Sequence, residues 1–406
     1  MPSIAIALRL QTSLFFFFFF FLFKLNPKLF FAWTAKVFGH VTSDDLSHLR
    51  RLVSEAESFR YLNQETSVFN KNRALFFREA EGVVAWGPFV RYVMLKIGPF
   101  PSNYDRGSED RVIRLLGELD SKNLDEADKL PLKTEDPVWP LDKDIPATFD
   151  ARKKWGKICP QISEVYDQGF CGSCWVSQVE SASDRLCISS KGKFQGLLSA
   201  QYVAFCCEDC GLGCHGGFTR MVWDFLKKGV VTGGHFNSSQ GCQPYSIQPC
   251  MHHSEEESNP YPRCETLPEE KPTCQKKCSN HQYDKAFRKD KHRFKSTYEV
   301  SMNVNRIQKD IMTYGPVTFR LKVYDDFFHY KSGVYEQTTT YCRGLHAVRA
   351  LGWGTENGKP YWLIANSWNR YWGDKGLFKI LRGENNCGIE EEAIGGVPRK
   401  RKQIGD

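Results

Sequence analysis

The chain has 406 residues, of which 41% are hydrophobic and 25% are charged. This composition is typical of a globular protein with room for two or three domains, and it excludes a chain too polar to bury a core. The formal net charge of +8 is mild for this length, and the Arg-Lys-Arg-Lys run at 399–402 predicts a solvated basic tail (399–406) rather than an arm that binds nucleic acid.

An apolar run, LFFFFFFFLF, occupies residues 14–23 and ends at Lys24. It has the length of a signal-peptide core and is too short to span a bilayer comfortably. We therefore expect residues 1–39 to be a signal peptide that directs the chain into the secretory pathway and leaves no membrane segment in the mature form. A wrongly assigned start is the alternative, because only Arg9 precedes the run and no small-x-small cleavage site follows it.

The next segment, residues 40–144, contains no cysteine, in contrast to the chain after residue 145. It carries two short amphipathic helix patterns, at 43–59 and 108–122, which begin at capping residues. Four prolines then indicate an extended connector over 129–152. These features are typical of a cleavable propeptide and its junction, and a small stable N-terminal domain is the alternative.

The cysteines are unevenly distributed along the chain. All 15 lie at or after Cys159, and 13 of them fall between Cys159 and Cys278. So many thiols favour an oxidising compartment, where they form disulfides. The distribution places a domain boundary near residue 145, and the odd count leaves at least one thiol unpaired.

The stretch DQGFCGSCWVSQ, at 167–178, has two cysteines three positions apart, Cys171 and Cys174. Redox pairs, zinc sites and nucleophile motifs all use cysteines at such spacing, so the pattern alone leaves these alternatives open. Two later stretches bear on the choice. RGLHAVRALGWG places His346 in an apolar strand pattern, and PYWLIANSWNRYWGDKGLFKI supplies Asn366 beside a tryptophan. Acyl transfer by a thiolate requires a set of this kind.

In that chemistry Cys174 is the nucleophile, and the helix pattern that follows it would put its sulfur at the positive end of a helix. His346 would keep the thiol ionised and then protonate the leaving amine. Asn366 would orient the imidazole, and Trp368 would shield that hydrogen bond from water. The side-chain NH2 of Gln168 would join the Cys174 backbone N–H in binding the oxyanion.

These motifs identify a family resemblance: residues 145–398 resemble the papain family of cysteine peptidases, and within it the cathepsin B-like members. The match to the C-G-[SA]-C-[WY] nucleophile signature lies at 171–175, and the Gln, Cys, His and Asn-Ser-Trp blocks occur in the family's order. The resemblance implies an α+β, papain-like fold of two lobes. A helical lobe over 145–295 would contain the nucleophile, and a lobe built on an antiparallel β-barrel over 296–398 would carry the histidine and asparagine.

The histidine and asparagine follow Cys174 by 172 and 192 residues, which is longer than the family's usual spacing. The insertion most consistent with this excess is the cysteine- and proline-rich stretch 242–278, whose core at 250–264 resembles the occluding loop of cathepsin B. The resemblance implies that His252 and His253 bind the C-terminal carboxylate of a substrate, as cations near pH 6. Asp167 would hold the first histidine. The alternative is a pair of exposed or adventitiously metal-binding histidines.

Further substrate contacts follow from the same resemblance. Gly216 and Gly217 are expected to pair with an extended substrate through β-type hydrogen bonds. Glu392 is expected at the base of the pocket for the second residue before the scissile bond, which would then accept arginine as well as large apolar side chains. Asn237 begins a glycosylation sequon, Asn-Ser-Ser.

The resemblance also implies six disulfides: Cys159 with Cys187, Cys171 with Cys214, Cys206 with Cys274, Cys207 with Cys210, Cys242 with Cys278, and Cys250 with Cys264. Three cysteines remain. Cys174 is the nucleophile, Cys387 is expected to be a small buried apolar residue, and Cys342 is expected to be an inert thiol, with a redox-sensitive one as the alternative.

Three departures from the cathepsin B pattern bear on activity. Leu345 stands where a glycine usually precedes the histidine, so it crowds the cleft wall. Tyr371 replaces the acid that would pair with Arg263 to anchor the loop, which predicts a looser loop and more endopeptidase action. The helix after Cys174 is one residue shorter than usual, and a one-residue change turns the following helical faces by about 100°.

Three hypotheses therefore compete. The first is a secreted or lysosomal cysteine peptidase made as a zymogen, whose propeptide inhibits it until acid loosens carboxylate contacts. The second is a papain-fold binding protein with an impaired site, and the third is a zinc or redox protein. We expect the first, acting as a monomer on peptide and protein substrates, with cystatin-type inhibitors as further partners and with no cofactor, no metal and no nucleic acid.

Overall fold

The structure is a computed structural model that describes residues 116–120, 129–177, 179–253, 258–268 and 272–399, all within one unit, Gly98–Asp406. The expected signal peptide and most of the expected propeptide lie outside these ranges, as do residues 400–406 of the basic tail. Among the residues that the structure describes, none of the helices has both the length and the hydropathy of a membrane span.

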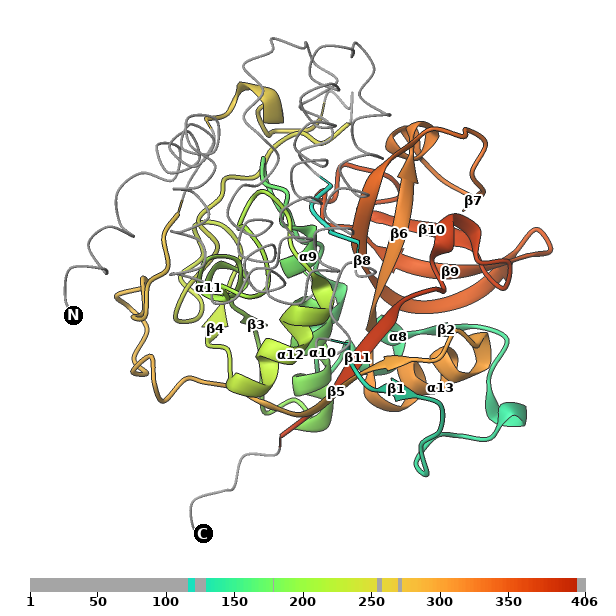
Figure 1. The fold of residues 1–406 in the computed structure, drawn as a ribbon, viewed down its shortest axis with the longest axis horizontal. Helices are drawn as coiled ribbons and strands as arrows, with labels where there is room; N and C mark the ends of the chain where they lie inside the picture. The colour runs from blue at the N-terminus through green and yellow to red at the C-terminus, as the bar shows by residue number, and fades with distance from the viewer. Residues whose placement is uncertain (1–115, 121–128, 178, 254–257, 269–271, 400–406) are drawn as a thin grey trace, which may run out of the picture. The chain divides into compact units, whose positions relative to one another are not determined.

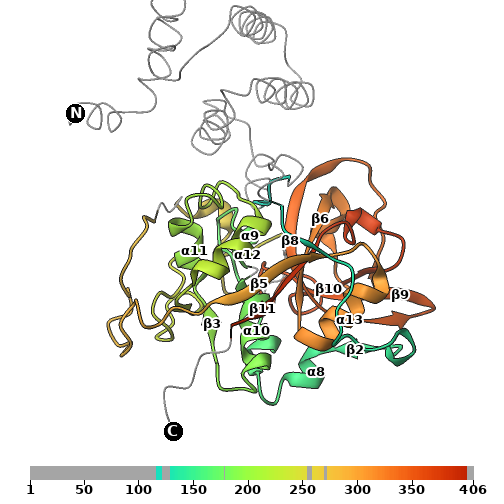
Figure 2. The same cartoon turned by 60° about the horizontal axis from the view of Figure 1, so that its bottom comes forward.

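The helical lobe lies on one side of the molecule in both views (Figures 1 and 2). Its helices are α9 (Cys174–Ser177), α10 (Val179–Ser189), α11 (Ala200–Cys206) and α12 (Thr219–Lys228), with the short strands β3 (Leu197–Leu198) and β4 (Thr232–Gly233) paired beside them. In α12 the buried positions Val222, Trp223 and Leu226 have helical spacing, and the helix ends at Gly229, whose φ of 102° suits glycine. Gln178, between α9 and α10, is outside the described residues.

The second lobe is a sheet of nine strands in the order β1-β5-β11-β6-β8-β9-β10-β7, with β2 also paired to β8. Only two pairs, β1 with β5 and β10 with β7, are parallel within the described residues. The strands are β1 (Leu132–Lys133), β2 (Phe149–Asp150), β5 (Phe294–Val300), β6 (Val317–Tyr324), β7 (Val334–Tyr335), β8 (Cys342–Glu356), β9 (Lys359–Ala365), β10 (Leu377–Leu381) and β11 (Ala393–Pro398).

Short helices complete the described part of the chain. They are α8 (Ala151–Trp155), α13 (Val304–Tyr314) and the 3-10 turns η3 (Asp142–Asp144), η4 (Pro160–Ser163), η5 (Cys264–Thr266), η6 (Asp325–His329) and η7 (Asn386–Gly388). Asn303 caps α13, since its side chain accepts a hydrogen bond from the Arg306 backbone N–H, and α13 ends at Gly315.

The two lobes do not divide the sequence with a single cut near residue 295. Strand β5 begins at Phe294, and β2 pairs with the middle of β8 although it comes from the start of the expected helical lobe. Ala151 and Trp155 of α8 pack in a small core with Leu351 of β8. The reason is that strand pairing depends on which sheet edges are available. The segment at Phe149–Trp155 therefore packs with the β lobe, although the residues that follow it in sequence belong to the helical lobe.

The amphipathic pattern at 108–122 predicted a helix, and this prediction is wrong over residues 116–120. There the chain is extended, and Glu118 forms β-bridges with Leu345 and Gly217. Backbone pairing with these two partners replaces the intrahelical hydrogen bonds that the local sequence would favour.

Candidate active site

Cys174 is the first residue of α9 and lies at the meeting point of the lobes. Its side chain is fully buried and forms no disulfide, whereas the neighbouring Cys171 is bonded to Cys214. The backbone N–H of Ala347, on β8, contacts the Cys174 sulfur and favours its ionised form. The structure therefore separates the two cysteines of the 167–178 motif into one disulfide partner and one thiol that forms no disulfide.

His346 and Asn366 are brought together by the pairing of β8 with β9. The His346 Nε2 donates to Asn366 Oδ1 at 2.7 Å, which leaves Nδ1 buried and without a hydrogen-bond partner among the described residues. The Trp368 ring packs against the imidazole with centroids 4.8 Å apart and is itself buried. The residue after His346 is Ala347, whose backbone N–H contacts the Cys174 sulfur. The imidazole with the unbonded Nδ1 is therefore carried by the strand that contacts the thiol.

Gln168 lies in the turn before α9 and is completely buried. Its Nε2 donates to the Cys171 carbonyl at 2.8 Å, and its Oε1 accepts from Ser367 Oγ at 2.7 Å. These two hydrogen bonds fix the plane of the Gln168 amide between the turn that precedes Cys174 and the turn that follows Asn366. The sequence motifs thus converge on one location, as the resemblance implied.

Buried ion pairs hold α10, the helix that follows α9 in the chain, against the histidine strand β8. Arg349, three positions after His346, pairs with Glu180 at 2.9 Å and with Asp184 at 3.0 Å. All three side chains are nearly inaccessible, and a buried charge without its partner is strongly destabilising. Sequence patterns did not single out these residues, because a charged side chain inside α10 normally indicates a solvated helix face.

The extended segment at 116–120 fills the cleft beside the thiol. The Gly117 backbone N–H donates to Cys174 Sγ at 3.3 Å. Gly217 N–H donates to the Gly117 carbonyl at 2.8 Å, and the Leu119 N–H donates to the Gly217 carbonyl at 2.8 Å. Because the sulfur meets an amide N–H and not a carbonyl carbon, this segment occupies the cleft without being positioned for attack.

A β-carbon cannot be accommodated at Gly117. It would lie 1.7 Å from the carbonyl oxygen of Gly172, which is backbone and cannot swing away. Gly216, the other glycine expected to line the cleft, approaches the same segment, and a β-carbon there would lie 3.0 Å from the Gly117 carbonyl. Glycine at 117 therefore permits the chain to pass directly over the nucleophile turn.

The two candidate catalytic groups are both uncharged in this buried arrangement. Burial, together with the nearby Glu118 carboxyl, raises the pKa of the Cys174 thiol to about 12. Burial lowers the pKa of His346 to about 4, although its hydrogen bond to Asn366 opposes this. A neutral thiol beside a neutral imidazole is the unreactive form of such a pair.

The Glu118 carboxyl differs from the expectation that acid loosens the carboxylate contacts of the propeptide. Its Oε1 accepts from the Thr219 backbone N–H at 3.1 Å and its Oε2 from Thr219 Oγ1 at 2.5 Å. Burial and the neighbouring Glu392 raise the pKa of Glu118 from 4.5 to about 8. The bound segment therefore favours a protonated Glu118, so acid strengthens this contact.

The loop at 250–264 is closed by the Cys250–Cys264 disulfide, and it lies over the tryptophan side of the site. His252 Nε2 donates to Asp167 Oδ1 at 2.7 Å, and Asn369 Nδ2 donates both to Asp167 Oδ2 and to the Cys250 carbonyl, at 2.8 Å each. Residues 254–257 are outside the described part of the loop.

His253 differs from the expectation of a cationic partner. Its ring lies 4.4 Å from Phe328 and 5.2 Å from Trp368, measured between centroids, and its Nε2 is buried. Burial and the neighbouring histidines lower its pKa to about 3, so it is neutral at pH 6 in this form of the protein. Arg263, which lacks the expected acid, is largely exposed, and Tyr261 contacts Tyr371 edge to face instead.

The expected pocket acid, Glu392, is buried as predicted, but it is not available to a basic substrate side chain. Its Oε1 accepts from Arg220 Nε at 2.9 Å, and its Oε2 accepts from Arg320 Nε at 2.7 Å. Sequence analysis missed both arginines. The available signals were the position of Arg220 directly after Gly-Gly-Phe-Thr and a charged residue within the apolar strand β6.

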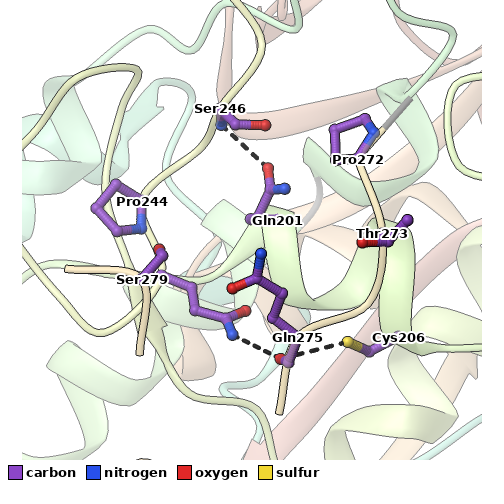
Figure 3. A pocket seen from close by; sticks show the side chains of 9 residues that line it. Gln201, Cys206, Pro244, Ser246, Pro272, Thr273, Gln275 and Ser279 are labelled. Atoms are coloured by element: carbon purple, nitrogen blue, oxygen red, sulfur yellow. Dashed lines mark hydrogen bonds between the residues drawn. The ribbon is translucent and has the colours of Figure 1, made fainter. Parts of the chain in front are cut away.

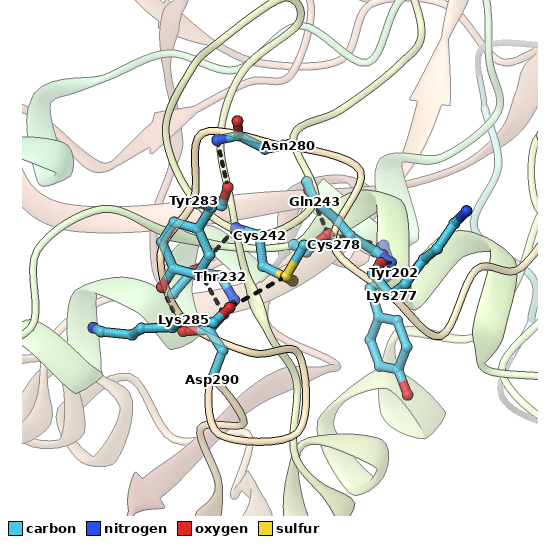
Figure 4. The surroundings of a disulfide bond; sticks show 12 residues. Tyr202, Thr232, Cys242, Gln243, Lys277, Cys278, Asn280, Tyr283, Lys285 and Asp290 are labelled. Carbon is cyan, nitrogen blue, oxygen red and sulfur yellow. Dashed lines mark hydrogen bonds between the residues drawn. A yellow bond between two sulfur atoms is a disulfide. The ribbon is translucent and has the colours of Figure 1, made fainter.

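Six disulfides are present among the described residues, and their pairs are those that the resemblance implied: Cys159–Cys187, Cys171–Cys214, Cys206–Cys274, Cys207–Cys210, Cys242–Cys278 and Cys250–Cys264. Around Cys242–Cys278, Asn280 Nδ2 donates to the Gly241 carbonyl at 2.9 Å and Tyr283 OH donates to Asp290 at 2.6 Å (Figure 4). Cys387 is buried, and Cys342 is exposed.

A surface hollow of about 400 Å³ lies in this cysteine-rich part of the chain (Figure 3). In it the Ser246 N–H donates to Gln201 Oε1 at 3.0 Å, and Pro244, Pro272 and Thr273 form part of the wall. None of the candidate catalytic residues lines it. The cleft at Cys174 is already filled by residues 116–120, so the hollow is a separate feature.

Three side chains of the loop could suggest a metal site, since ligand atoms of Cys250, His252 and Cys264 lie within 4.8 Å of one another. Both sulfurs are joined in a disulfide and so cannot act as thiolate ligands. His252 is also committed to Asp167. This group is therefore a disulfide packed against a histidine.

Comparison with known proteins agrees with this geometry. The model of the family described as papain family cysteine protease matches residues 145–397. The chain is 48% identical over 258 residues to Cathepsin B-like cysteine proteinase 4 of Caenorhabditis elegans, covering 63% of this chain and 76% of that protein. It is 46% identical over 259 residues to the Cathepsin B-like cysteine proteinase of Schistosoma japonicum, covering 63% and 74% respectively.

Two solved structures share the fold of this chain. The procathepsin B S9 of Trypanosoma congolense matches with a TM-score of 0.59 at 29% identity, over 76% of this chain and 96% of that one. The digestive procathepsin L2 of Tenebrio molitor shares the fold, with a TM-score of 0.52 at 22% identity over 85% and 99%. The chain belongs to the papain family of cysteine proteases, and it is a cathepsin B-like protease that carries a propeptide.

Proposed function

We propose that Cys174, His346 and Asn366 hydrolyse peptide bonds. The Cys174 thiolate attacks the scissile carbonyl carbon, and the carbonyl oxygen becomes an oxyanion that the Gln168 side-chain NH2 and the Cys174 backbone N–H stabilise. His346, held by Asn366, gives its proton to the leaving amine as the C–N bond breaks. Water, activated by the same imidazole, then releases the acyl group and restores the thiol.

The observation that carries this proposal is the Gly117 N–H on the Cys174 sulfur, in a cleft that also contains the paired His346 and Asn366. An extended chain already lies where a substrate would have to lie, and Gly217 holds it by β-type hydrogen bonds. We infer that residues 116–120 are the part of the propeptide that blocks the nucleophile, and that their removal lets the thiol and the imidazole form an ion pair.

We further propose that the loop at 250–264 gives the enzyme C-terminal peptidyl-dipeptidase activity beside its endopeptidase activity. The Asp167–His252 hydrogen bond supports this, because it fixes one imidazole at the Trp368 end of the site. His253 would contribute once cleared of its apolar contacts. The enzyme would act as a monomer on peptides and proteins in the secretory pathway, in lysosomes or outside the cell, with cystatin-type inhibitors as partners and Asn237 glycosylated.

The proposal is tested by titrating the acid-matured protein with an irreversible epoxysuccinyl inhibitor of thiol proteases and mapping the labelled residue by mass spectrometry. We expect one label per molecule, at Cys174, and none in Cys174→Ser. Cys342→Ser serves as the matched control, because it removes the exposed thiol, and its labelling should equal that of the parent. Folded mature protein that takes up no label would support instead the hypothesis of a binding protein with an impaired site.

The loop assignment gives a separate prediction. Asp167→Asn keeps a hydrogen-bonding side chain but removes the charge that holds His252, so we expect release of C-terminal dipeptides to fall about tenfold. Cleavage of an internally quenched endopeptidase substrate should be maintained or increased. Both rates are measured on one preparation, and an equal loss of both would mean that Asp167 supports the fold of the site rather than the loop.

A further inference from the structure

The place beside Gly217 where the Glu118 side chain is buried, which we call the pocket, borders a cluster of alternating charge. Glu392 lies at its base, and each of its carboxylate oxygens accepts a hydrogen bond from a different guanidinium, those of Arg220 and Arg320. Arg220 also pairs with Glu299 at 2.6 Å, and Arg320 lies 3.8 Å from Glu391. Both oxygens of Glu392 are therefore occupied by hydrogen bonds from the protein itself.

The occupant of this pocket in the structure is the side chain of Glu118. Gly217 hydrogen-bonds the backbone on both sides of residue 118, and residue 117 is the one that lies on the sulfur. Glu118 thus fills the pocket for the residue next to the one over the nucleophile. Its side chain is nearly inaccessible, and both carboxyl oxygens accept from Thr219, through the backbone N–H and the hydroxyl.

A basic side chain would bind less favourably than glutamate in this position. Lysine and arginine side chains only donate hydrogen bonds, so they could not accept from the Thr219 N–H, and both oxygens of Glu392 are already bonded to Arg220 and Arg320. An apolar side chain would also leave the two Thr219 donors without acceptors, but it would bury no charge. A glutamine or a protonated glutamate satisfies Thr219 and carries no charge.

We propose that Arg220 and Arg320 make this pocket select glutamine and glutamate at the substrate residue that binds beside Gly217, and reject arginine and lysine. The inference rests on the proposed function, and it names the substrate class of the same site. Arg220 and Arg320 are then specificity residues, which act by occupying Glu392, and Thr219 supplies the hydrogen bonds that recognise the substrate.

The test uses the mature enzyme and fluorogenic dipeptides that differ only in the residue before a constant arginine: Gln, Glu, Leu or Arg. At pH 5.5 we expect kcat/KM to fall in the order Gln and Glu, then Leu, then Arg, with a ratio of Gln to Arg of about tenfold or more. A substrate with arginine that is cleaved as well as one with glutamine would overturn the proposal.

Variants then assign the preference to the two arginines. Arg320→Ala and Arg220→Gln each free one oxygen of Glu392. Each variant should therefore raise kcat/KM for the Arg substrate by about tenfold relative to kcat/KM for the Gln substrate. Adding Glu392→Gln to either variant should abolish that gain. The ratio is taken within each variant, so it is independent of how much protein folds, and an unchanged ratio in both variants would overturn the proposal.

A measurement without turnover separates this inference from the proposed function. Peptides of residues 112–122, with Glu118 retained or replaced by Gln or Arg, are titrated onto the mature Cys174→Ser protein by fluorescence anisotropy. Weak binding of the Arg peptide alone supports the pocket assignment even if no peptide is hydrolysed. Equal binding of all three overturns it, and failure of iodoacetamide to label Cys174 in the parent enzyme concerns the proposed function only.

Discussion

The Gly117→Ala proenzyme is expected to expose its nucleophile, with the rate of Cys174 alkylation by iodoacetamide at pH 7 rising at least about 100-fold above that of the parent proenzyme. The added methyl would lie 1.7 Å from the Gly172 carbonyl oxygen, so residues 116–120 cannot keep their path across the cleft. Once the segment lifts, Cys174 and His346 are no longer buried beneath it. In the blocked form the pKa of the thiol is about 12 and that of the imidazole about 4. After the segment lifts, the pKa of the thiol falls and that of the imidazole rises, so the two groups can form an ion pair.

Alkylation is followed by mass spectrometry of the uncleaved chain, so that processing does not confuse the result. Asp120→Asn is the matched control in the same segment, because its contact with Arg320 is 3.6 Å long and partly exposed, and we expect little change. If Gly117→Ala leaves Cys174 as unreactive as in the parent, the contact at Gly117 is not what blocks the thiol.

The second large effect concerns Glu118 and pH. Its pKa is 4.5 when the segment is free and about 8 when bound, so the contribution of this side chain to holding the segment is fully present below about pH 4.5. That contribution is lost as pH rises toward 8, because binding then requires uptake of a proton. Glu118→Gln keeps an oxygen for Thr219 and does not titrate.

The expected result is measured with the peptide of residues 112–122 as an inhibitor of the mature enzyme. At pH 7.5 the peptide that carries Glu118→Gln should inhibit about 10- to 100-fold more tightly than the parent peptide, and at pH 4 the two should agree within about threefold. Thr219→Val in the enzyme removes a hydrogen bond that lowers the pKa of bound Glu118, so it should weaken binding of the parent peptide and shift its pH profile toward higher pH. Parallel pH profiles for the two peptides would contradict the assignment of Glu118.

The pH behaviour of Glu118 also illustrates where sequence reasoning stopped. Its residue type suggested a carboxylate that acid would release, as in a surface ion pair. Its environment reverses the sign, because the carboxyl is buried beside Glu392 and receives its hydrogen bonds from the uncharged donors of Thr219. Burial and neighbours decide such signs, and they are properties of the folded chain.

His253 shows the same limit. The adjacent histidines were correctly associated with the loop, and the partner of His252 was correctly taken as Asp167. The charge expected on His253 was wrong for this form of the protein, because Phe328 and Trp368 enclose its ring. Neither aromatic residue is near it in sequence, so no local pattern could indicate the desolvation.

The sequence by itself determined the features that depend on residue type and order. The Cys, His and Asn-Ser-Trp blocks identified the family and the candidate catalytic groups, and the cysteine pattern led to the six disulfide pairs through that resemblance. Such groups can be read from a chain because their chemistry belongs to the residue itself: a thiol, an imidazole and an amide keep their roles wherever the fold places them.

Only the tertiary structure decided which groups meet. Glu118 and Thr219 are 101 residues apart in the chain, and Arg220 and Glu392 are 172 apart. The amphipathic pattern around Glu118 favours a helix locally, but backbone pairing with Gly217 and Leu345 makes this segment extended. Contacts of this kind depend on packing and on the direction of side chains in the folded lobes, and these fix the charge of the pocket, the blocked state of the thiol and the response to pH.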